Sequence, residues 1–420
     1  MLPVLHDPTH ETEPGIRSMQ SLRRHPAVII TALGSAQIVS WGSLFYGFPL
    51  FVLPMTDAFG WSLPLLNGAA TVGLLTAGLC AYPVGAIIDR YGGRVIMTGG
   101  SLGASLLLAA WSQVEQPVAL YAVWLGLGAC MAAILYDPAF AVLTQHFGTD
   151  ARRAITALTL IAGFASTVFI PLIESLLTVL IWREVLLVLA GLHVCVCIPI
   201  HWWLVPPQSL ARSTAEAAAP SSSDEARAVM RQRLRDPLFW GLCVWFTAWW
   251  ASLSGLVFQF VPYLKSIGVE TASIVIAAAL IGPMQFVGRL TMMACGERAR
   301  ISLVGALTTT LSLGAVAILL VSPPRLGWLV LFAIAFGITN GITSILRGVA
   351  PAEWLGREHY GKTIGVMGAP MMVASALSPL GTAAIWTATD DPAWMLGALL
   401  GVALLGAVGF WFAALRSGLR

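Results

Sequence analysis

Charged residues are scarce in this 420-residue chain: Lys, Arg, Asp and Glu together make up 10% of it, while hydrophobic residues make up 57%. A soluble chain of this length needs about a quarter of its residues charged to cover its surface. With a mean hydropathy of +0.81, the composition excludes an ordinary water-soluble protein and predicts a chain solvated by lipid. The net charge of +3 comes from loop arginines and gives no indication of nucleic-acid binding.

Patterns typical of enzymes and metal sites are also missing. No nucleotide-binding loop of the form Gly-x-x-x-x-Gly-Lys-Ser/Thr occurs, which argues against transport driven by the chain's own ATP hydrolysis. The segment Gly99 to Gly103 matches a serine-hydrolase turn, but it lies in an apolar run, where small residues four apart favour close helix packing. No His or Cys stands at zinc spacing. We therefore predict no enzyme, cofactor or metal site, and we expect the cysteines to be buried free thiols. They are Cys80, Cys130, Cys195, Cys197, Cys243 and Cys295.

Long apolar runs, in contrast, fill most of the chain. About 20 apolar residues allow a helix to cross the hydrocarbon core of a bilayer with every backbone group bonded internally. Twelve such runs, separated by charged or turn-rich breaks, predict an all-α membrane protein with twelve transmembrane helices. The runs cover 27–55, 64–88, 95–113, 118–144, 154–179, 184–204, 238–264, 271–293, 301–321, 327–349, 361–388 and 393–415.

The basic residues predict how these helices are oriented, because cytoplasmic loops retain Lys and Arg. Of the 23 Lys and Arg residues, all but Arg183, Lys265 and Arg325 fall near every second connection or in the two tails. Both termini are thus predicted to be cytoplasmic. The first tail, 1–26, is too polar for the core of a signal peptide, and the last tail is 416–420.

The longest polar stretch separates two halves. Residues 205–236 predict a cytoplasmic linker that begins as a flexible segment and ends in a basic segment at the membrane surface. The linker divides the spans into six-helix bundles over 27–204 and 237–415. An offset of 208 positions matches Pro171 to Pro379, which favours two related, pseudo-symmetric bundles.

The loop between the second and third runs carries the most specific motif, GAIIDRYGGR over 85–94. A tight turn needs glycine at its bend, and its acid can pair with arginines or approach a helix N-terminus. This segment resembles the signature loop Gly-x-x-x-Asp-Arg-x-Gly-x-Arg of the major facilitator superfamily, at the place where that family carries it. The resemblance covers the whole chain and implies a transporter, with a cytoplasmic gate at this loop. The implied gate residues are Gly85, Asp89, Arg90, Gly92 and Arg94.

Two stretches further resemble the monocarboxylate-porter branch of that family and its bacterial relatives, 46–62 and 285–289. In the second stretch the branch places an acid four residues before a substrate-binding Arg, whereas here Gln285 precedes Arg289. The resemblance implies that Arg289 binds an anionic substrate through its planar guanidinium. The alternative is that Arg289 extends to the lipid headgroups, and both interpretations stay open.

Other charged residues inside the runs have two interpretations each. Asp137 and Arg347 approach the cytosolic ends of the fourth and tenth runs. Our hypothesis is that they join Asp89, Arg90 and Arg94 in the gate without touching substrate; the alternative is ordinary helix-end charges. Glu174 and His193 are weak candidates for proton coupling. An ion pair of Glu174 with Arg183, and packing of His193, are the favoured interpretations.

In the family that the chain resembles, the first, fourth, seventh and tenth helices line a central cavity. Tryptophan in the seventh run suits an apolar or aromatic part of a substrate, although Trp is also common at membrane interfaces. The candidate substrate-binding residues are Gln37, Trp41, Tyr46, Trp249, Gln285, Arg289 and Asn340.

These observations predict a multi-pass transporter of the cell membrane that works by alternating access. The favoured solute is an organic anion such as a monocarboxylate, moved by a proton or solute gradient, and efflux of amphipathic drug-like compounds is the alternative. A non-transporting sensor is disfavoured because no large extramembrane domain is present. We expect the partners to be a small-molecule substrate, protons and the lipid bilayer, and the functional unit to be a monomer.

Overall fold

A computed structural model describes residues 25–205, 223–323 and 325–418. Within these ranges the chain forms helices and no strand. Nearly all of the predicted first tail, the start of the predicted linker and the last two residues lie outside the described residues.

The first part of the chain forms helices at each of the six runs predicted there. Their bounds are α2 Pro26–Trp41, η1 Gly42–Tyr46, α3 Phe48–Phe59, α4 Leu63–Tyr91, α5 Gly93–Trp111, α6 Pro117–Ile134, α7 Tyr136–Phe147, η2 Gly148–Asp150, α8 Ala151–Ala162, α9 Ala165–Leu177, α10 Trp182–Leu192, η3 His193–Cys197 and η4 Ile200–Leu204.

The second part begins with a helix inside the predicted linker and continues with helices at the other six runs. Their bounds are α12 Ser223–Arg235, α13 Pro237–Ser266, α14 Thr271–Cys295, η5 Gly296–Arg298, α15 Ile301–Val321, α16 Leu326–Trp354, α17 Tyr360–Thr389 and α18 Pro392–Ser417. Predicted and observed ends differ by a few residues, because charged and turn-forming residues bound both. Proline in the first turn begins several helices, among them α6 and α13, since its missing N–H would be unpaired there anyway.

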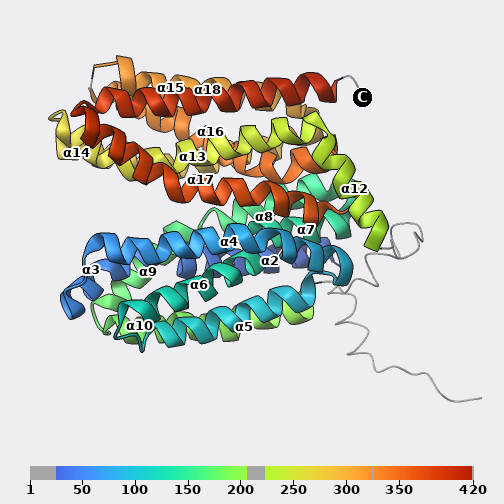
Figure 1. The fold of residues 1–420 in the computed structure, drawn as a ribbon, viewed down its shortest axis with the longest axis horizontal. Coiled ribbons are helices and arrows are strands. Elements are labelled where there is room, and N and C mark those ends of the chain that lie inside the picture. The colour runs from blue at the N-terminus through green and yellow to red at the C-terminus, as the bar shows by residue number, and fades with distance from the viewer. Residues whose placement is uncertain (1–24, 206–222, 324, 419–420) are drawn as a thin grey trace, which may run out of the picture.

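Among the residues that the structure describes, eleven stretches are long and apolar enough to cross a membrane. One of them, Pro117–Leu177, runs through α6, α7, α8 and α9 and has 61 residues. Figure 1 shows α2 to α10 gathered on one side of the molecule and α13 to α18 on the other. The two groups meet most extensively where α4 packs along α17. The chain is therefore a multi-pass helical membrane protein.

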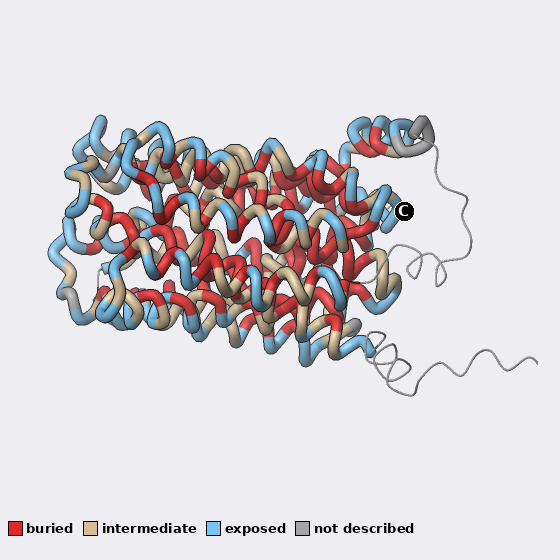
Figure 2. The backbone as a smooth tube through the Cα atoms, turned by 90° about the horizontal axis from the view of Figure 1, so that it is seen from below, coloured by how far each residue is buried: buried red, intermediate tan, exposed pale blue. Residues whose placement is uncertain are grey.

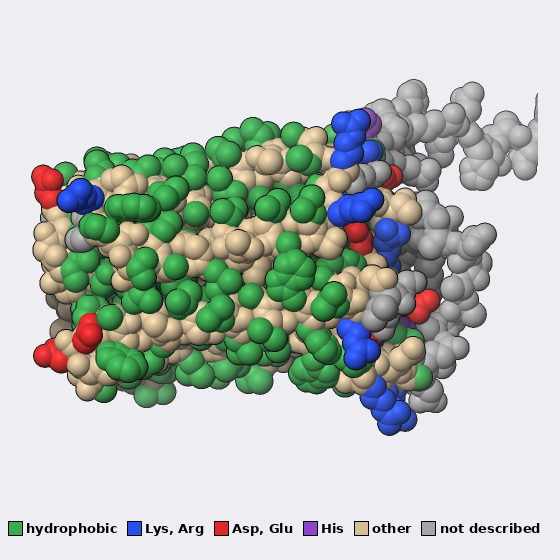
Figure 3. Space-filling view, turned by 90° about the horizontal axis from the view of Figure 1, so that it is seen from above, with side chains coloured by type: hydrophobic (Ala, Val, Ile, Leu, Met, Phe, Trp, Pro, Cys, Tyr) green, Lys and Arg blue, Asp and Glu red, His purple; other side chains and the backbone are tan. Residues whose placement is uncertain are grey.

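Buried residues alternate with exposed ones along the helices (Figure 2), and apolar residues occur in both classes. Large residues such as Leu53, Leu79 and Val118 are 66–78% exposed, as expected of side chains that contact lipid. Figure 3 shows an apolar belt with most of the visible Lys and Arg at one end, where the grey residues lie; we call this the basic end. The expectation of buried thiols was wrong for Cys195 and Cys295, which face outward from their helices.

Candidate functional site

The fourth predicted run is broken in the middle, between α6 and α7. Leu135 has an extended conformation (φ −80°, ψ −155°), which interrupts the helix. Gln37 is fully buried, and its Nε2 donates to the carbonyl oxygens of Ile134 (2.7 Å) and Leu135 (3.2 Å). The Ile134 carbonyl has no donor at the usual helical position, because residue 138 is a proline and lacks an N–H. Gln37, predicted as a substrate contact, thus bonds to the backbone at the break.

The break places Asp137 in the first turn of α7, ten residues before that helix ends. At 1.5 Å per residue this is about 15 Å from the end, which is half of a hydrocarbon core about 30 Å thick. Asp137 therefore lies deeper than the helix-end position expected from the sequence. The sequence around Asp137 does not reveal this depth, because the break between α6 and α7 cannot be recognised from it.

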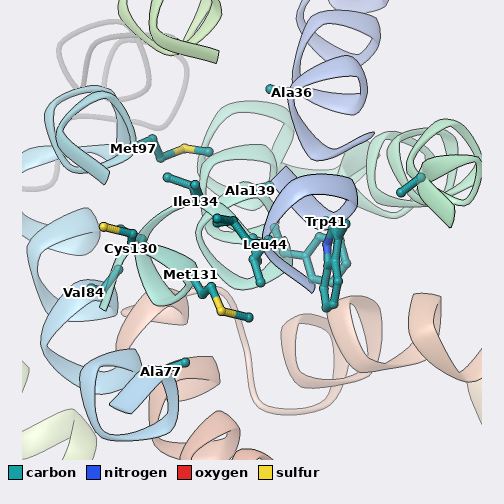
Figure 4. Packing of buried hydrophobic residues seen from close by; sticks show 14 of the residues in the cluster. Ala36, Trp41, Leu44, Ala77, Val84, Met97, Cys130, Met131, Ile134 and Ala139 are labelled. Atoms are coloured by element: carbon teal, nitrogen blue, oxygen red, sulfur yellow. The ribbon is translucent and has the colours of Figure 1, made fainter. Parts of the chain in front are cut away.

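A small central cavity of about 30 Å³ opens beside Asp137, between the two groups of helices. This volume holds about one or two water molecules. The walls are aromatic and apolar except for Asp137 and Arg347. The aromatic residues of the wall are Trp41, Phe45, Tyr136 and Trp250, and its aliphatic residues include Leu74, Ala77, Met131 and Met372. Figure 4 shows Trp41, Ala77 and Met131 converging on this region.

Asp137 and Arg347 form an ion pair that joins the two groups of helices across this cavity. The side chains are 19% and 4% exposed, so the pair is largely removed from solvent. The guanidinium carbon of Arg347 also lies 5.7 Å from the ring centre of Trp250. Asp137 lies beside Gly368 and Asp89 beside Gly361, two turns earlier on α17. The structure therefore does not bring the Asp137–Arg347 pair to Asp89, as the hypothesis of one gate network required.

Arg289 lies at a second point between the two groups. It is 7% exposed, its guanidinium lies against Gly163, directly after α8, and the hydroxyls of Tyr46 and Tyr136 are near enough to interact with its charge. In the described part of the chain, no carboxylate or carbonyl accepts a hydrogen bond from it, and its Nε is buried without a partner. Burying a charge without a partner is costly, so an unpaired guanidinium here calls for an anion.

Three aromatic rings connect Arg289 to the central cavity. The ring centre of Trp41 lies 5.0 Å from that of Tyr136 and 6.3 Å from that of Tyr46. Trp41 and Tyr136 both line the cavity. Of these residues the sequence analysis named Trp41, Tyr46 and Arg289 and missed Tyr136, although its position next to an intramembrane acid was a usable signal. Gln285 stands one helical turn before Arg289 and is partly buried.

The remaining candidates of the second half face a different cavity. Trp249 Nε1 donates to Asn340 Oδ1 (2.9 Å), and Trp249 lines a cavity of about 20 Å³ enclosed by α13, α15, α16 and α18. Hydroxyl groups of Ser252, Thr309 and Thr339 are buried around it. The structure thus separates Trp249 and Asn340 from Arg289 and the central cavity.

The signature loop contacts the other half of the molecule at the basic end. Asp89 accepts hydrogen bonds from the backbone N–H groups of Gly361 (2.9 Å) and Lys362 (2.8 Å), in the first turn of α17. The helix dipole favours a carboxylate at that position. Gly85 lies directly against the backbone of Gly361, so the two helices touch there without side chains between them.

The other three signature residues act within their own half. Gly92 ends α4 with a φ of +81°, which favours glycine. Arg94 Nε donates to the carbonyl of Val205 (2.9 Å), and Arg90 lies over the ring of Tyr91. A second bridge at this end, missed by the sequence analysis, is made by Arg152, which donates to the carbonyl of Ala299 and pairs with Glu353 at 3.7 Å.

The two weaker proton-coupling candidates lie apart from the central cavity. Glu174 is exposed, and the expected ion pair with Arg183 is not formed, because Arg183 donates to the carbonyls of Ser112 and Val114 at the end of α5. His193 is fully buried, with its Nε2 2.8 Å from Ser43 Oγ. The Ser43 hydroxyl donates to Val39 O, so His193 Nε2 carries the hydrogen in that bond.

Comparisons with known proteins agree on one family. The family model described as "Major Facilitator Superfamily" matches residues 33–307. The chain is 23% identical over 330 residues to an MFS-type transporter of Aspergillus fumigatus, covering 75% of this chain and 74% of that one. It is 24% identical over 322 residues to monocarboxylate transporter 12-B of Danio rerio, covering 70% and 67%.

Solved structures of the same family share the fold. FucP in its outward conformation superposes with a TM-score of 0.69 at 13% identity, covering 93% of this chain and 99% of that one. The human organic anion transporter MFSD10 gives a TM-score of 0.66 at 16% identity, with the same coverage.

Proposed function

The chain belongs to the major facilitator superfamily and is a membrane transporter; from this premise we propose that it carries a small organic monoanion by alternating access, driven by protons. The observation that carries the proposal is Arg289. Its guanidinium is buried between the two halves, has no acceptor among the described residues, and lies beside aromatic rings that continue into the central cavity. A carboxylate satisfies such a guanidinium with two parallel hydrogen bonds.

The proposal includes the orientation and the number of spans. The 61-residue run Pro117–Leu177 is about 90 Å long at helical rise, too long for one crossing, so it supports two crossings, one by α6 with α7 and one by α8 with α9. With twelve crossings, in bundles over 27–204 and 237–415, both termini are on the same side of the membrane, and the excess of Lys and Arg supports the cytosol as that side, together with the linker and the basic end. The described bridges through Asp89 and Arg152 lie at that end, which supports a state closed toward the cytosol.

The charges around the cavity favour a monoanion. Arg289 and Arg347 contribute two positive charges, and Asp137 contributes one negative charge. The balance is a single positive charge, which one carboxylate neutralises. The aromatic walls suit an apolar or aromatic body attached to that carboxylate.

A thermal-shift screen tests the substrate class directly. Purified protein is heated with carboxylates, other oxyanions, sugars and cationic drugs, and a ligand at about 100 times its Kd is expected to add about 2.7 kcal/mol of stability. We expect stabilisation by carboxylates with an apolar body. Stabilisation by cationic or neutral amphipathic drugs alone contradicts the anion proposal and supports the alternative, drug efflux, for which the aromatic cavity walls are the supporting observation.

Asp137 is the proposed proton-coupling group. Its ion pair with Arg347 joins the two halves. The halves can therefore separate there only after the Asp137 carboxylate is protonated, or after a carboxylate of the substrate takes its place beside Arg347. In proteoliposomes, Asp137→Asn is expected to abolish accumulation of the identified carboxylate against its gradient while exchange across the membrane continues.

The matched control is Glu174→Gln, which removes an exposed acid far from the cavity and is expected to leave accumulation intact. Accumulation by Asp137→Asn at the wild-type level contradicts the coupling role of this residue. Loss of accumulation in Glu174→Gln alone assigns coupling to Glu174 instead.

A further inference from the structure

Helix α12, inside the linker, has two faces. Met230 and Arg233 are each 7% exposed and dock against the transporter, whereas Arg227, Arg231 and Arg235 are exposed. The exposed arginines recur every four residues, so they form one stripe on the side away from the docked face. We call it the arginine stripe.

The docked face makes a specific contact through Arg233. Its Nη1 donates to the carbonyl of Leu355 (2.5 Å), and its Nη2 donates to the carbonyls of Gly356 (3.3 Å) and Glu358 (2.9 Å). These carbonyls belong to the loop that joins α16 to α17. Gly356 and His359 in this loop have φ values of +92° and +48°, so the backbone turns sharply there. The hydrogen bonds from the Arg233 guanidinium stabilise this turn.

The same loop presents the N-terminus of α17 to the other half of the transporter. Gly361 and Lys362, three and four residues after Glu358, donate the hydrogen bonds to Asp89 that close the basic end. A continuous set of contacts thus runs from α12 through the loop to Asp89. Anything that positions α12 acts on this closure.

The exposed face of α12 has the chemistry of a helix at a lipid surface. Next to the arginine stripe lie the apolar side chains of Leu234 and Trp240, which are 41% and 51% exposed and joined by a bond from Trp240 Nε1 to Leu234 O (2.8 Å). Arg235 precedes the membrane-spanning helix α13 by two residues. Figure 1 shows α12 at the end of the bundle where the grey traces leave. Basic and apolar side chains combined on one face favour the headgroup region of a bilayer with anionic lipids.

We propose that the arginine stripe binds the phosphate groups of anionic phospholipids and that this holds Arg233 in the α16–α17 loop, which favours the state closed toward the cytosol. The inference rests on the proposed orientation, with the basic end in the cytosol. It does not depend on the identity of the substrate.

The experiment measures the gate and not transport. Spin labels on Thr149→Cys and on the exposed native Cys295, with the other cysteines replaced, report the distance between the halves at the basic end by double electron-electron resonance. In nanodiscs, replacing phosphatidylcholine by phosphatidylglycerol is expected to raise the closed-to-open ratio. Neutralising two arginines of the stripe in Arg231→Gln/Arg235→Gln is expected to reduce this lipid effect about thirtyfold, since each arginine near an anionic surface contributes about 1 kcal/mol.

Two variants separate the stripe from the contact that it supports. Arg298→Gln/Arg300→Gln removes two exposed arginines from the α14–α15 loop at the same end and is expected to keep the lipid effect. Arg233→Ala is expected to lower the closed fraction in both lipids. An undiminished lipid effect in the Arg231/Arg235 variant overturns the proposal, and so does the same response to free inorganic phosphate in phosphatidylcholine. Loss of carboxylate binding without a change in the lipid effect would overturn only the substrate assignment.

Discussion

Replacement of Arg289 by glutamine is expected to weaken carboxylate binding by about a hundredfold or more and to abolish carboxylate counterflow in proteoliposomes. Removing one partner of a buried charge pair costs about 2–5 kcal/mol, because the other charge then stays buried and unpaired. In Arg289→Gln the carboxylate is that other charge. The measurement is substrate-induced thermal stabilisation, followed by counterflow of the same compound.

Two further variants make this prediction specific. Arg289→Lys keeps the positive charge but lacks the planar pair of donors, so we expect binding intermediate between wild type and Arg289→Gln. Arg298→Gln removes an exposed arginine nine residues later and is expected to bind like wild type. Wild-type binding by Arg289→Gln contradicts the proposed anion site, and it leaves Arg347 as the next cation to test.

The position of Arg289 favours one of its two interpretations, substrate binding, over extension to the lipid headgroups. Its guanidinium lies against Gly163 and near Tyr46 and Tyr136, instead of extending to the headgroups. Gln285 explains why it is unpaired: an acid one turn earlier on the same face would be placed to neutralise it. Because Gln285 is uncharged, the positive charge of Arg289 remains available to pair with an anionic substrate.

Much of the fold was predictable from the sequence because a bilayer imposes a simple requirement on each run of residues. A helix in lipid must be apolar along its whole length and must end where polar groups reach water, so spans such as 301–321 could be delimited from composition alone. The basic loops, Pro at helix starts and Gly92 at a helix end are equally local signals. The helical end of the linker, α12, was missed because its residues are polar and arginine-rich.

The site was predictable only in part, because its geometry depends on contacts between distant segments. The break at Leu135 is stabilised by Gln37, almost a hundred residues earlier, and neither residue signals it alone. The sequence also does not show which face of a long apolar helix points to the central cavity. Trp249 was therefore expected in that cavity but faces the interior of its own bundle. Arg152 and Arg233 donate to backbone carbonyl groups. Every residue has such a group, so a sequence cannot indicate which carbonyl an arginine will contact.

Gly85→Ala is expected to open the basic end. At Gly85 and Gly361 the backbones of α4 and α17 touch, and a Cβ on residue 85 would overlap the carbonyl oxygen of Gly361. The helices then have to separate at the point where Asp89 binds the N–H groups of Gly361 and Lys362. Overpacking costs about 1–3 kcal/mol, and each hydrogen bond to a charged group about 1.5–3 kcal/mol. We therefore expect the closed-to-open ratio to fall about a hundredfold, measured as the distance between labels on Thr149→Cys and Cys295.

The control for this prediction is Gly99→Ala, because Gly99 is also within a helix but a Cβ there meets nothing within 4 Å. Both variants gain the same methyl group and the same helix propensity, so a difference between them reports the contact with Gly361 alone. Asp89→Asn separates the two contributions further: it keeps Gly85 in place but weakens the attraction to the α17 N-terminus, and it is expected to open the end less than Gly85→Ala does. A closed distance retained in Gly85→Ala would mean that α17 moves without releasing Asp89, and the closure of this end would then rest on Arg152 and its bonds to Ala299 and Glu353.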